Sequence, residues 1–218
     1  RLPDHNIVSW TALIGGYTEL GCGEEALKLF DEMQLEGIYP NNVTFICGLK
    51  ACGDLGAACK GQAIHAEVSR KGLLEKDVVV SSILVDMYAR CGMLGKAQKV
   101  LEKLSSRDVV AWNAIITLYA QLGKGIEAFE LFARMLWNDD VMPDSVTFVS
   151  ILNACANEDV STYGMLIHHL IIESIGIVDV AVETAIVHMY GKCDAFDNAF
   201  SVFIRIHQRN VVSFNTML

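Results

Sequence analysis

The sequence repeats itself with a period of 102 residues, and this period constrains the fold more than any other feature. Residues 109–135 read VVAWNAIITLYAQLGKGIEAFELFARM, and residues 7–33 read IVSWTALIGGYTELGCGEEALKLFDEM. In both copies, apolar residues spaced i, i+3, i+4, i+7 form two runs with glycines between them. This pattern predicts two short helices joined by a tight turn. The matched residues of the first copy are Trp10, Leu13, Ile14, Tyr17, Ala26, Leu29, Phe30 and Met33.

Each period contains three shorter units of helical pattern. Thr44, Phe45, Leu49, Ala51, Cys52 and His65 recur 103 residues later, and Met87, Tyr88 and Cys91 recur 102 residues later. The predicted units are 7–41, 42–77, 78–108, 109–144, 145–179 and 180–210, with 1–6 ending an earlier unit and 211–218 beginning another. Helix-turn-helix units at a short fixed period indicate an all-α solenoid, whose units bury their apolar faces by stacking.

Composition agrees with such an array and excludes several classes. The chain is 52% hydrophobic, yet it contains no run of 18 apolar residues, so no membrane span is expected. The seven cysteines include no C-x-x-C pair, which favours free thiols that fill gaps between helices in a reducing compartment. The chain runs from Arg1 to Leu218, and we interpret it as a segment of a longer solenoid with any targeting signal outside it.

The local patterns resemble known repeats. Residues 109–135 resemble the standard (P) type of pentatricopeptide repeat. The stretches TFICGLKACGDLGAACKGQAIHAEV and TFVSILNACANEDVSTYGMLIHHLI resemble the long (L) type. VVVSSILVDMYARCGMLGKAQKVLEKLSSRD and VAVETAIVHMYGKCDAFDNAFSVFIRI resemble the short (S) type, and the alternation resembles the plant PLS subclass. Tetratricopeptide repeats are the nearest competitor, but their uniform 34 residues do not fit this alternation.

This resemblance implies a right-handed α-solenoid that binds single-stranded RNA, with one base read per repeat. In the family, the fifth and last residues of a repeat contact the base edge, and the second residue packs on the base face. The implied edge-reading residues are Thr11 with Asn41, Ser82 with Asp108, Asn113 with Asp144, Thr184 with Asn210, and Asn215 without its partner. The implied face-packing residues are Val8, Val43, Val79, Val110, Val146, Ala181 and Val212.

A plainer interpretation of these polar residues stays open. The closing Asp and Asn residues are also the preferred caps of a following helix, and we expect them to serve both purposes. Thr11, Asn113 and Thr184 fall one turn inside the predicted helices, where a cap is not needed and base contact is favoured over a polar helix face. The long units depart from the pattern, because Ile46 and Val149 cannot hydrogen-bond a base edge. These units are expected to discriminate bases poorly and to offer a surface to an accessory editing-factor protein.

The net charge of −9 argues against binding dominated by phosphate contacts, although it leaves base reading possible along one groove. A peptide-binding scaffold of tetratricopeptide-like type is therefore the alternative function. His65-Ala66-Glu67 matches the H-x-E part of a zinc deaminase signature, but no P-C-x-x-C follows it. The chain is therefore predicted to be no enzyme, to need no metal or cofactor, and to act on neither a membrane nor a small-molecule substrate. The resemblance implies targeting of RNA processing in a mitochondrion or chloroplast, most often C-to-U editing, with any deaminase outside this chain.

Overall fold

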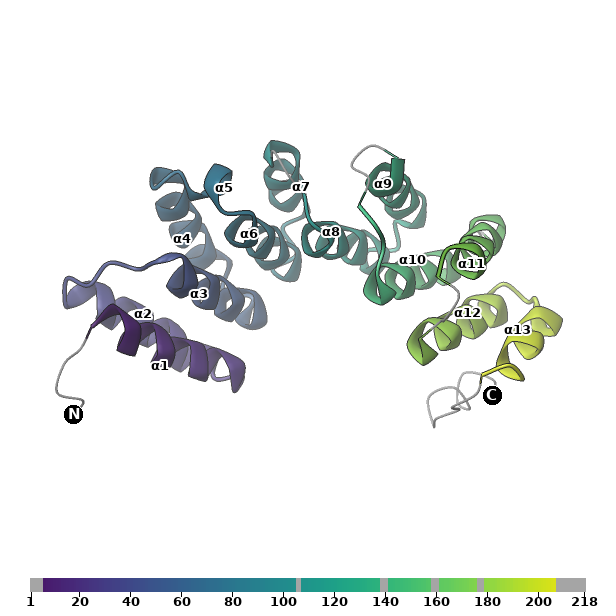
Figure 1. The fold of residues 1–218 in the computed structure, drawn as a ribbon, viewed down its shortest axis with the longest axis horizontal. Helices are drawn as coiled ribbons and strands as arrows, with labels where there is room; N and C mark the ends of the chain where they lie inside the picture. The colour runs from purple at the N-terminus through teal and green to yellow at the C-terminus, as the bar shows by residue number, and fades with distance from the viewer. Residues whose placement is uncertain (1–5, 105–106, 138–140, 158–160, 176–178, 207–218) are drawn as a thin grey trace. The chain divides into compact units, whose positions relative to one another are not determined.

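The described residues of the computed structural model form α-helices joined by short loops, with no strand among them (Figure 1). They are 6–104, 107–137, 141–157, 161–175 and 179–206. The prediction of an all-α fold built from helical hairpins is confirmed. The helices are α1 (Ile7–Glu19), α2 (Gly23–Leu35), α3 (Asn42–Leu55), α4 (Ala58–Arg70), α5 (Leu73–Lys76), α6 (Val78–Arg90), α7 (Leu94–Lys103), α8 (Val109–Gln121), α9 (Gly125–Trp137), α10 (Ser145–Asn157), α11 (Ser161–Ile175), α12 (Val180–Lys192) and α13 (Phe196–Phe203).

The first helix of each pair begins where a predicted unit begins. These helices are α1, α3, α6, α8, α10 and α12. Ten of the thirteen described helices have 10–14 residues, as expected from ordinary helix lengths. The short α5 was not expected: it follows a chain reversal at Gly72, whose φ of 65° is unfavourable for other residues.

The contacts divide the chain into two units, 1–115 and 116–218, and the boundary falls inside α8. In the first unit, α3 is central: it packs against α1, α2, α4 and α6, while α6 also contacts α4, α5 and α7. The core is made of fully buried side chains that include Ile14, Phe30, Phe45, Leu49 and Leu84. Leu13 lies outside this core and is 41% exposed, although its spacing matches the buried face. It lies on α1, which packs on α2 and α3.

The second unit repeats this arrangement. α10 packs against α9, α11 and α12, and α12 packs against α11 and α13. Phe148 and Leu152 are buried where Phe45 and Leu49 are buried in the first unit. Phe132 lies edge-on to Phe148 with ring centroids 6.1 Å apart, as Phe30 lies tilted to Phe45 at 6.2 Å. Within the described residues, every helix is too short or too polar to cross a membrane.

A histidine–tyrosine pair recurs in the two units. His65 Nδ1 lies 2.7 Å from the Tyr88 hydroxyl and links α4 to α6, while His168 Nδ1 lies 2.9 Å from the Tyr190 hydroxyl and links α11 to α12. Burial lowers the pKa of His65, and the positive charges of Lys103 and Lys96 lower it further. Burial lowers the pKa of His168 too, with smaller contributions from Arg205 and His169. Both imidazoles are therefore held neutral near pH 7.

The packing predicts a sharp contrast between two neighbouring positions of α3. Phe45→Ala empties a fully buried site and should destabilise the chain by about 3–5 kcal/mol. Val43→Ala, two residues earlier on an exposed position, should change stability by less than about 0.5 kcal/mol. Urea unfolding followed by far-UV circular dichroism measures both. Equal losses in the two variants would contradict the buried and exposed faces assigned to α3.

The two histidine–tyrosine pairs predict how stability depends on pH. The pKa of each histidine is lower in the folded chain than its ordinary value of 6.5, so the unfolded chain binds more protons. Stability should therefore fall as the pH is lowered from about 7.5 to about 5.5, through the histidine pKa of the unfolded chain. The measurement is the urea midpoint across this range. His65→Gln with His168→Gln should weaken the dependence, while His188, whose pKa is also lowered by burial, keeps the rest of it. An unchanged slope in this double variant would contradict the assignment.

Candidate nucleic-acid interface

Small apolar side chains are exposed to solvent at the start of the first helix of each helical pair. Four predicted face-packing valines of the first unit, Val8, Val43, Val79 and Val110, are between 43% and 70% exposed. In the second unit, Val146 and Ala181 are exposed at the same register. None of these side chains contributes to the core, so stability does not explain why this position is apolar. An exposed β-branched side chain offers a flat apolar contact of the kind that a base face can cover.

The closing residues of the first five predicted units each cap the helix that follows. Asn41 Oδ1 accepts from Thr44 N at 2.9 Å, and Asp108 Oδ1 accepts from Ala111 N at 2.9 Å. Asp77 caps α6, Asp144 caps α10 and Asp179 caps α12 through the same kind of bond, and Asn6 caps α1. The expected capping role is confirmed, and it fixes one oxygen of each closing side chain at a helix N-terminus.

The first predicted edge-reading pair, Thr11 with Asn41, is joined through a third residue. Thr11 Oγ1 lies 2.7 Å from Thr44 Oγ1, and Thr44 Oγ1 donates to Asn41 Oδ1 at 2.9 Å. Because Oδ1 is committed to Thr44, the amide nitrogen of Asn41 is the remaining polar atom. Among the described residues it has no protein acceptor. The pair therefore presents an amide donor beside a threonine hydroxyl.

The second pair is in direct contact. Ser82 Oγ lies 2.7 Å from Asp108 Oδ1 and 2.8 Å from the carbonyl oxygen of Val78, so its single proton is used within the protein. Ser82 is only 1% exposed. Asp108 Oδ2 has no donor within the part of the chain that the structure describes. Ser82 thus orients a carboxylate whose second oxygen is available to accept a hydrogen bond.

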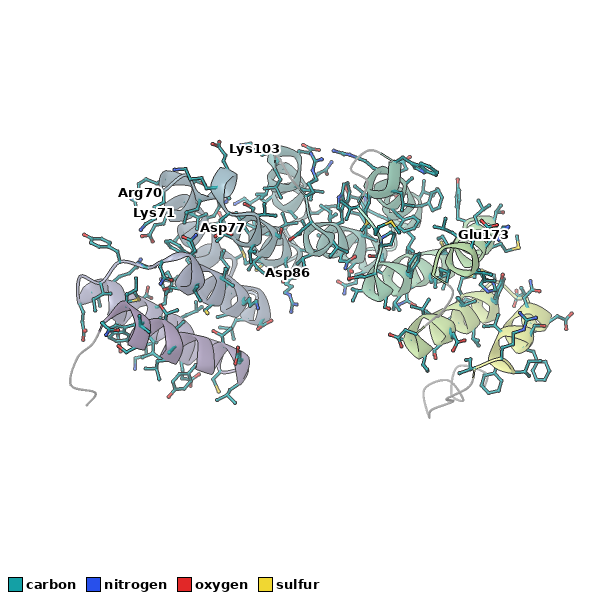
Figure 2. The ribbon with its side chains drawn as sticks, viewed as in Figure 1. Arg70, Lys71, Asp77, Asp86, Lys103 and Glu173 are labelled. Atoms are coloured by element: carbon teal, nitrogen blue, oxygen red, sulfur yellow. The ribbon has the colours of Figure 1, made fainter. Side chains whose placement is uncertain are left out.

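The first long unit is arranged differently. Asp77 Oδ1 accepts from the backbone N–H groups of Val79 and Val80, and Asp77 Oδ2 accepts from Asn42 Nδ2 at 2.6 Å. Both carboxylate oxygens are therefore used within the protein. Figure 2 labels Asp77 at the start of α6. Together with the half-buried Ile46, this leaves no strong edge-reading group in this unit.

The remaining predicted positions are placed to different degrees. Asn113 is buried on α8 and Asp144 is exposed before α10. Val149 is half-buried on α10, and Thr184 is half-buried on α12. Asn210, Val212 and Asn215 lie outside the described residues.

Sequence reasoning missed the residue that bridges the first pair. Thr44 recurs as Thr147, whose hydroxyl and N–H both bond Asp144 Oδ1. The signal was available, since a polar residue three positions after an Asn or Asp cap is the pattern of a capping box. The sequence shows that Thr44 recurs, but only the structure shows that Thr44 lies between Asn41 and Thr11.

The deaminase-like motif is part of the helical packing. His65 bonds Tyr88, and Glu67 accepts from Gln34 Nε2 at 2.9 Å. Within the described ranges, no three His, Cys, Asp or Glu side chains are grouped closely enough to hold a metal ion. The counterpart His168 makes the same tyrosine contact without a glutamate two residues later, so the motif has a structural explanation.

Comparisons with known proteins agree with this architecture. The PPR repeat family model matches residues 5–54 and 107–157, and the PPR repeat model matches residues 79–109. The Arabidopsis thaliana pentatricopeptide repeat-containing protein At4g18520, chloroplastic, is 37% identical over 217 residues, which are 100% of this chain and 35% of that protein. The protein CRR2, chloroplastic, of the same plant is 38% identical over 97% of this chain and 33% of its own length. The chain thus spans about a third of the length of these relatives.

The fold also matches a solved structure. The pentatricopeptide repeat protein PPR10, crystallised in complex with an 18-nt psaJ RNA element, superposes with a TM-score of 0.65 at 20% identity. The match covers 100% of this chain and 36% of that one. Because the identity is low, this match supports the fold alone. The family assignment rests on the repeat models, which together cover more than half of the sequence. The chain belongs to the pentatricopeptide repeat family.

Proposed function

We propose that this chain binds single-stranded RNA sequence-specifically, with each P-type or S-type repeat reading one base. The observation that carries the proposal is the geometry of the closing residues. Each lies beside an exposed apolar side chain, and Asn41 and Asp108 each keep one polar atom that has no partner among the described residues. An unexplained polar atom next to an apolar platform fits a base, which has a polar edge and an apolar face. PPR10, whose fold is similar, is known in complex with RNA.

The free atoms match particular base edges. The Asn41 amide nitrogen can donate to N1 of adenine, while the Thr11 hydroxyl can accept from the exocyclic amine of the same base. Asp108 Oδ2 can only accept, which suits the N1–H of guanine. Uracil offers an N–H at the corresponding position, and we assign it to Asn113 with Asp144. The proposed target reads A-any-G-U-any-A from 5′ to 3′, followed by a pyrimidine at Asn215.

The charge of the chain bears on how it holds RNA. A net charge of −9 allows few phosphate contacts, so the affinity must come largely from base stacking and edge hydrogen bonds. The same property would suit a peptide-binding scaffold. Such a scaffold does not explain why Asn41 and Asp108, beside exposed valines, each have a polar atom with no partner in the part of the chain that the structure describes.

We further propose that this RNA binding directs organellar RNA processing, most often C-to-U editing. Relatives named chloroplastic support an organelle, and a mitochondrial location fits the repeat type equally. In this proposal the chain selects the RNA and does not catalyse a reaction. A deaminase would lie outside residues 1–218.

The base assignment predicts the effect of one substitution. Asn113→Thr, with Asp144 kept, converts the fourth reading pair to Thr with Asp and should move its preference from U towards G. Threonine fits this register, because Thr11 occupies the equivalent position of α1. The measurement is binding to short RNAs that vary only at the fourth base, with an expected change of about 1–3 kcal/mol, taken by analogy with DNA base readout.

The same RNA panel supplies the control. The preference for A at the first and sixth bases, assigned to Thr11 and Thr184, should not change. If the variant keeps its preference for U, or weakens equally for all four bases, Asn113 does not read a base and the register is wrong. Selective binding of peptides with no RNA preference would favour the scaffold.

The long units are proposed to contact an accessory protein. Exposed apolar side chains gather on α11, where Met165, Leu166 and Ile172 are each about half exposed. The equivalent positions of α4 are Gln62, Ala63 and Ser69, so the apolar surface belongs to unit 145–179. The sequence analysis expected a partner surface on both long units, and we now propose it for unit 145–179 alone.

This difference predicts which long unit binds a partner. Leu166→Glu with Ile172→Glu should reduce capture of an accessory protein from an organellar extract at least about tenfold, since charge desolvation opposes apolar contact. The matched control is Ala63→Glu with Ser69→Glu on α4, which should leave capture unchanged. Equal capture by the wild type and both variants would contradict a partner on the long units.

A further inference from the structure

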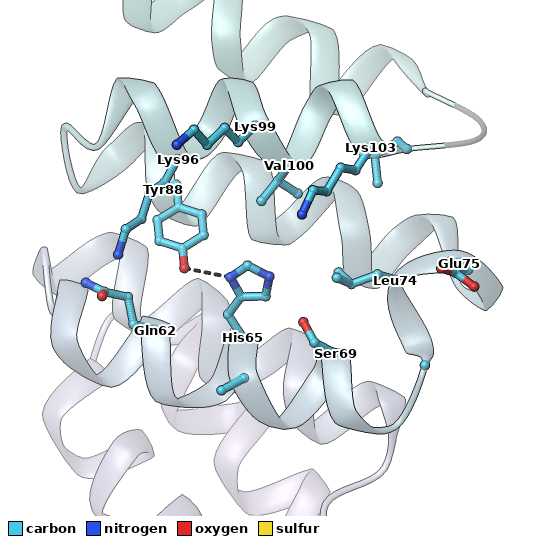
Figure 3. A pocket seen from close by; sticks show the side chains of 13 residues that line it. Gln62, His65, Ser69, Leu74, Glu75, Tyr88, Lys96, Lys99, Val100 and Lys103 are labelled. Atoms are coloured by element: carbon cyan, nitrogen blue, oxygen red, sulfur yellow. Dashed lines mark hydrogen bonds between the residues drawn. The ribbon is translucent and has the colours of Figure 1, made fainter.

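A cavity of about 660 Å³ lies in the first unit, bordered by α4, α5, α6 and α7 (Figure 3). Gln62, His65 and Ser69 line it from α4, Leu74 and Glu75 from α5, and Tyr88 from α6. Val100 and Leu104 add an apolar wall from α7 and its end. The base-reading residues Asn41, Ser82 and Asp108 do not line it. Its volume is typical of a small-molecule site.

The cavity is basic although the chain is acidic. Lys96, Lys99 and Lys103 lie at i, i+3 and i+7 on α7, which places them on one helix face along the cavity. Figure 3 shows their side chains along one side of it. Glu75 is the single carboxylate in the lining. Within the described ranges, none of the three lysines has a carboxylate at salt-bridge distance.

The lysine charges act on a residue that lines the cavity. Burial is the main cause that lowers the pKa of His65, and the positive charges of Lys103 and Lys96 lower it further. These charges therefore act on a side chain that lines the cavity. His65 itself is held by the Tyr88 hydroxyl at 2.7 Å. The Gln62 amide and the Ser69 hydroxyl add polar groups on the opposite helix. A neutral imidazole surrounded by uncompensated ammonium groups is an environment that an anion would stabilise.

The second unit provides an internal comparison. It keeps the histidine–tyrosine pair as His168 and Tyr190, but the cavity beside that pair measures about 110 Å³. Lys96 and Lys99 correspond to Asn198 and Ser201, and Ser69 corresponds to Ile172, while Arg205 alone stands where Lys103 stands. The shared pair is therefore part of the repeat framework, whereas the cavity and its lysines belong to one copy.

We propose that this cavity is a binding site for a small phosphorylated molecule of mononucleotide size, separate from the proposed base-reading residues. Three lysine ammonium groups within about two helical turns suit the closely spaced charges of a diphosphate. The apolar wall of Leu74, Val100 and Leu104 suits an uncharged organic moiety of the same ligand. RNA phosphates share this chemistry, so the experiment has to distinguish the two sources.

The test uses the 218-residue chain and three probes: ADP, adenosine and a short single-stranded RNA. Calorimetry should show ADP binding and no adenosine binding, since the lysines recognise the phosphates. Lys99→Gln with Lys103→Gln should weaken ADP binding at least about tenfold, because charge-assisted contacts are lost. ADP should also raise the pKa of His65, read from its imidazole NMR signals, by neutralising the lysine field.

The matched control is Lys28→Gln with Lys192→Gln, which removes the same total charge from exposed lysines outside the cavity. This variant should bind ADP as the wild type does. The proposal is overturned if ADP does not bind at millimolar concentration, if adenosine binds equally well, or if both double variants lose ADP affinity equally. It is also overturned if the Lys99 and Lys103 variant loses RNA affinity while keeping its ADP affinity.

Discussion

The cap at the start of each first helix is the interaction on which the rest of the structure depends. A closing Asn or Asp ends one unit and accepts the first free N–H groups of the next helix, as Asn41 does for α3 and Asp77 for α6. An uncapped helix start leaves backbone donors unsatisfied, and removing a cap typically costs about 0.5–2 kcal/mol. The cap also fixes the closing side chain in one orientation. The same bond therefore defines the repeat boundary and fixes the direction of a polar group beside the exposed valines.

Capping also divides the repeats into those with a free polar atom and those without one. Asp108 uses one oxygen for Ser82 and the start of α8, and its other oxygen has no donor among the described residues. Asp77 gives its second oxygen to Asn42, so nothing remains for a ligand. The two carboxylates have the same chemistry, and one neighbouring amide makes the difference. If the proposed pairs read bases, specificity depends on residues outside the pair, such as Thr44 and Asn42, as much as on the pair itself.

The helical pairs and their starts could be predicted from the sequence, because a 102-residue period with i, i+3, i+4, i+7 spacing leaves one consistent phase. The spacing correctly predicted that Trp10, Ile14 and Phe30 are buried, but Leu13 is exposed. Periodicity identifies the apolar face of a helix without showing what covers it. The short α5 was missed because Leu73–Lys76 has no period of its own. The capping role of the closing residues was predictable. The bridge through Thr44 and the cavity beside His65 could not be predicted, because each joins residues from different repeats.

Each type of repeat occurs twice, and comparing the two copies distinguishes residues that the fold requires from positions that it allows to vary. Gly61 and Gly164 are retained inside helices, where glycine is unfavourable, because an added Cβ would overlap Met87 and Met189 respectively. That contact is repeated along with the histidine–tyrosine pair, so it belongs to the framework. The lysines of α7 and the apolar surface of α11 occupy positions that the framework leaves free, and there the copies differ in charge and polarity. Positions that vary between copies around a constant frame are where a repeat protein can acquire different ligands without a cost in folding.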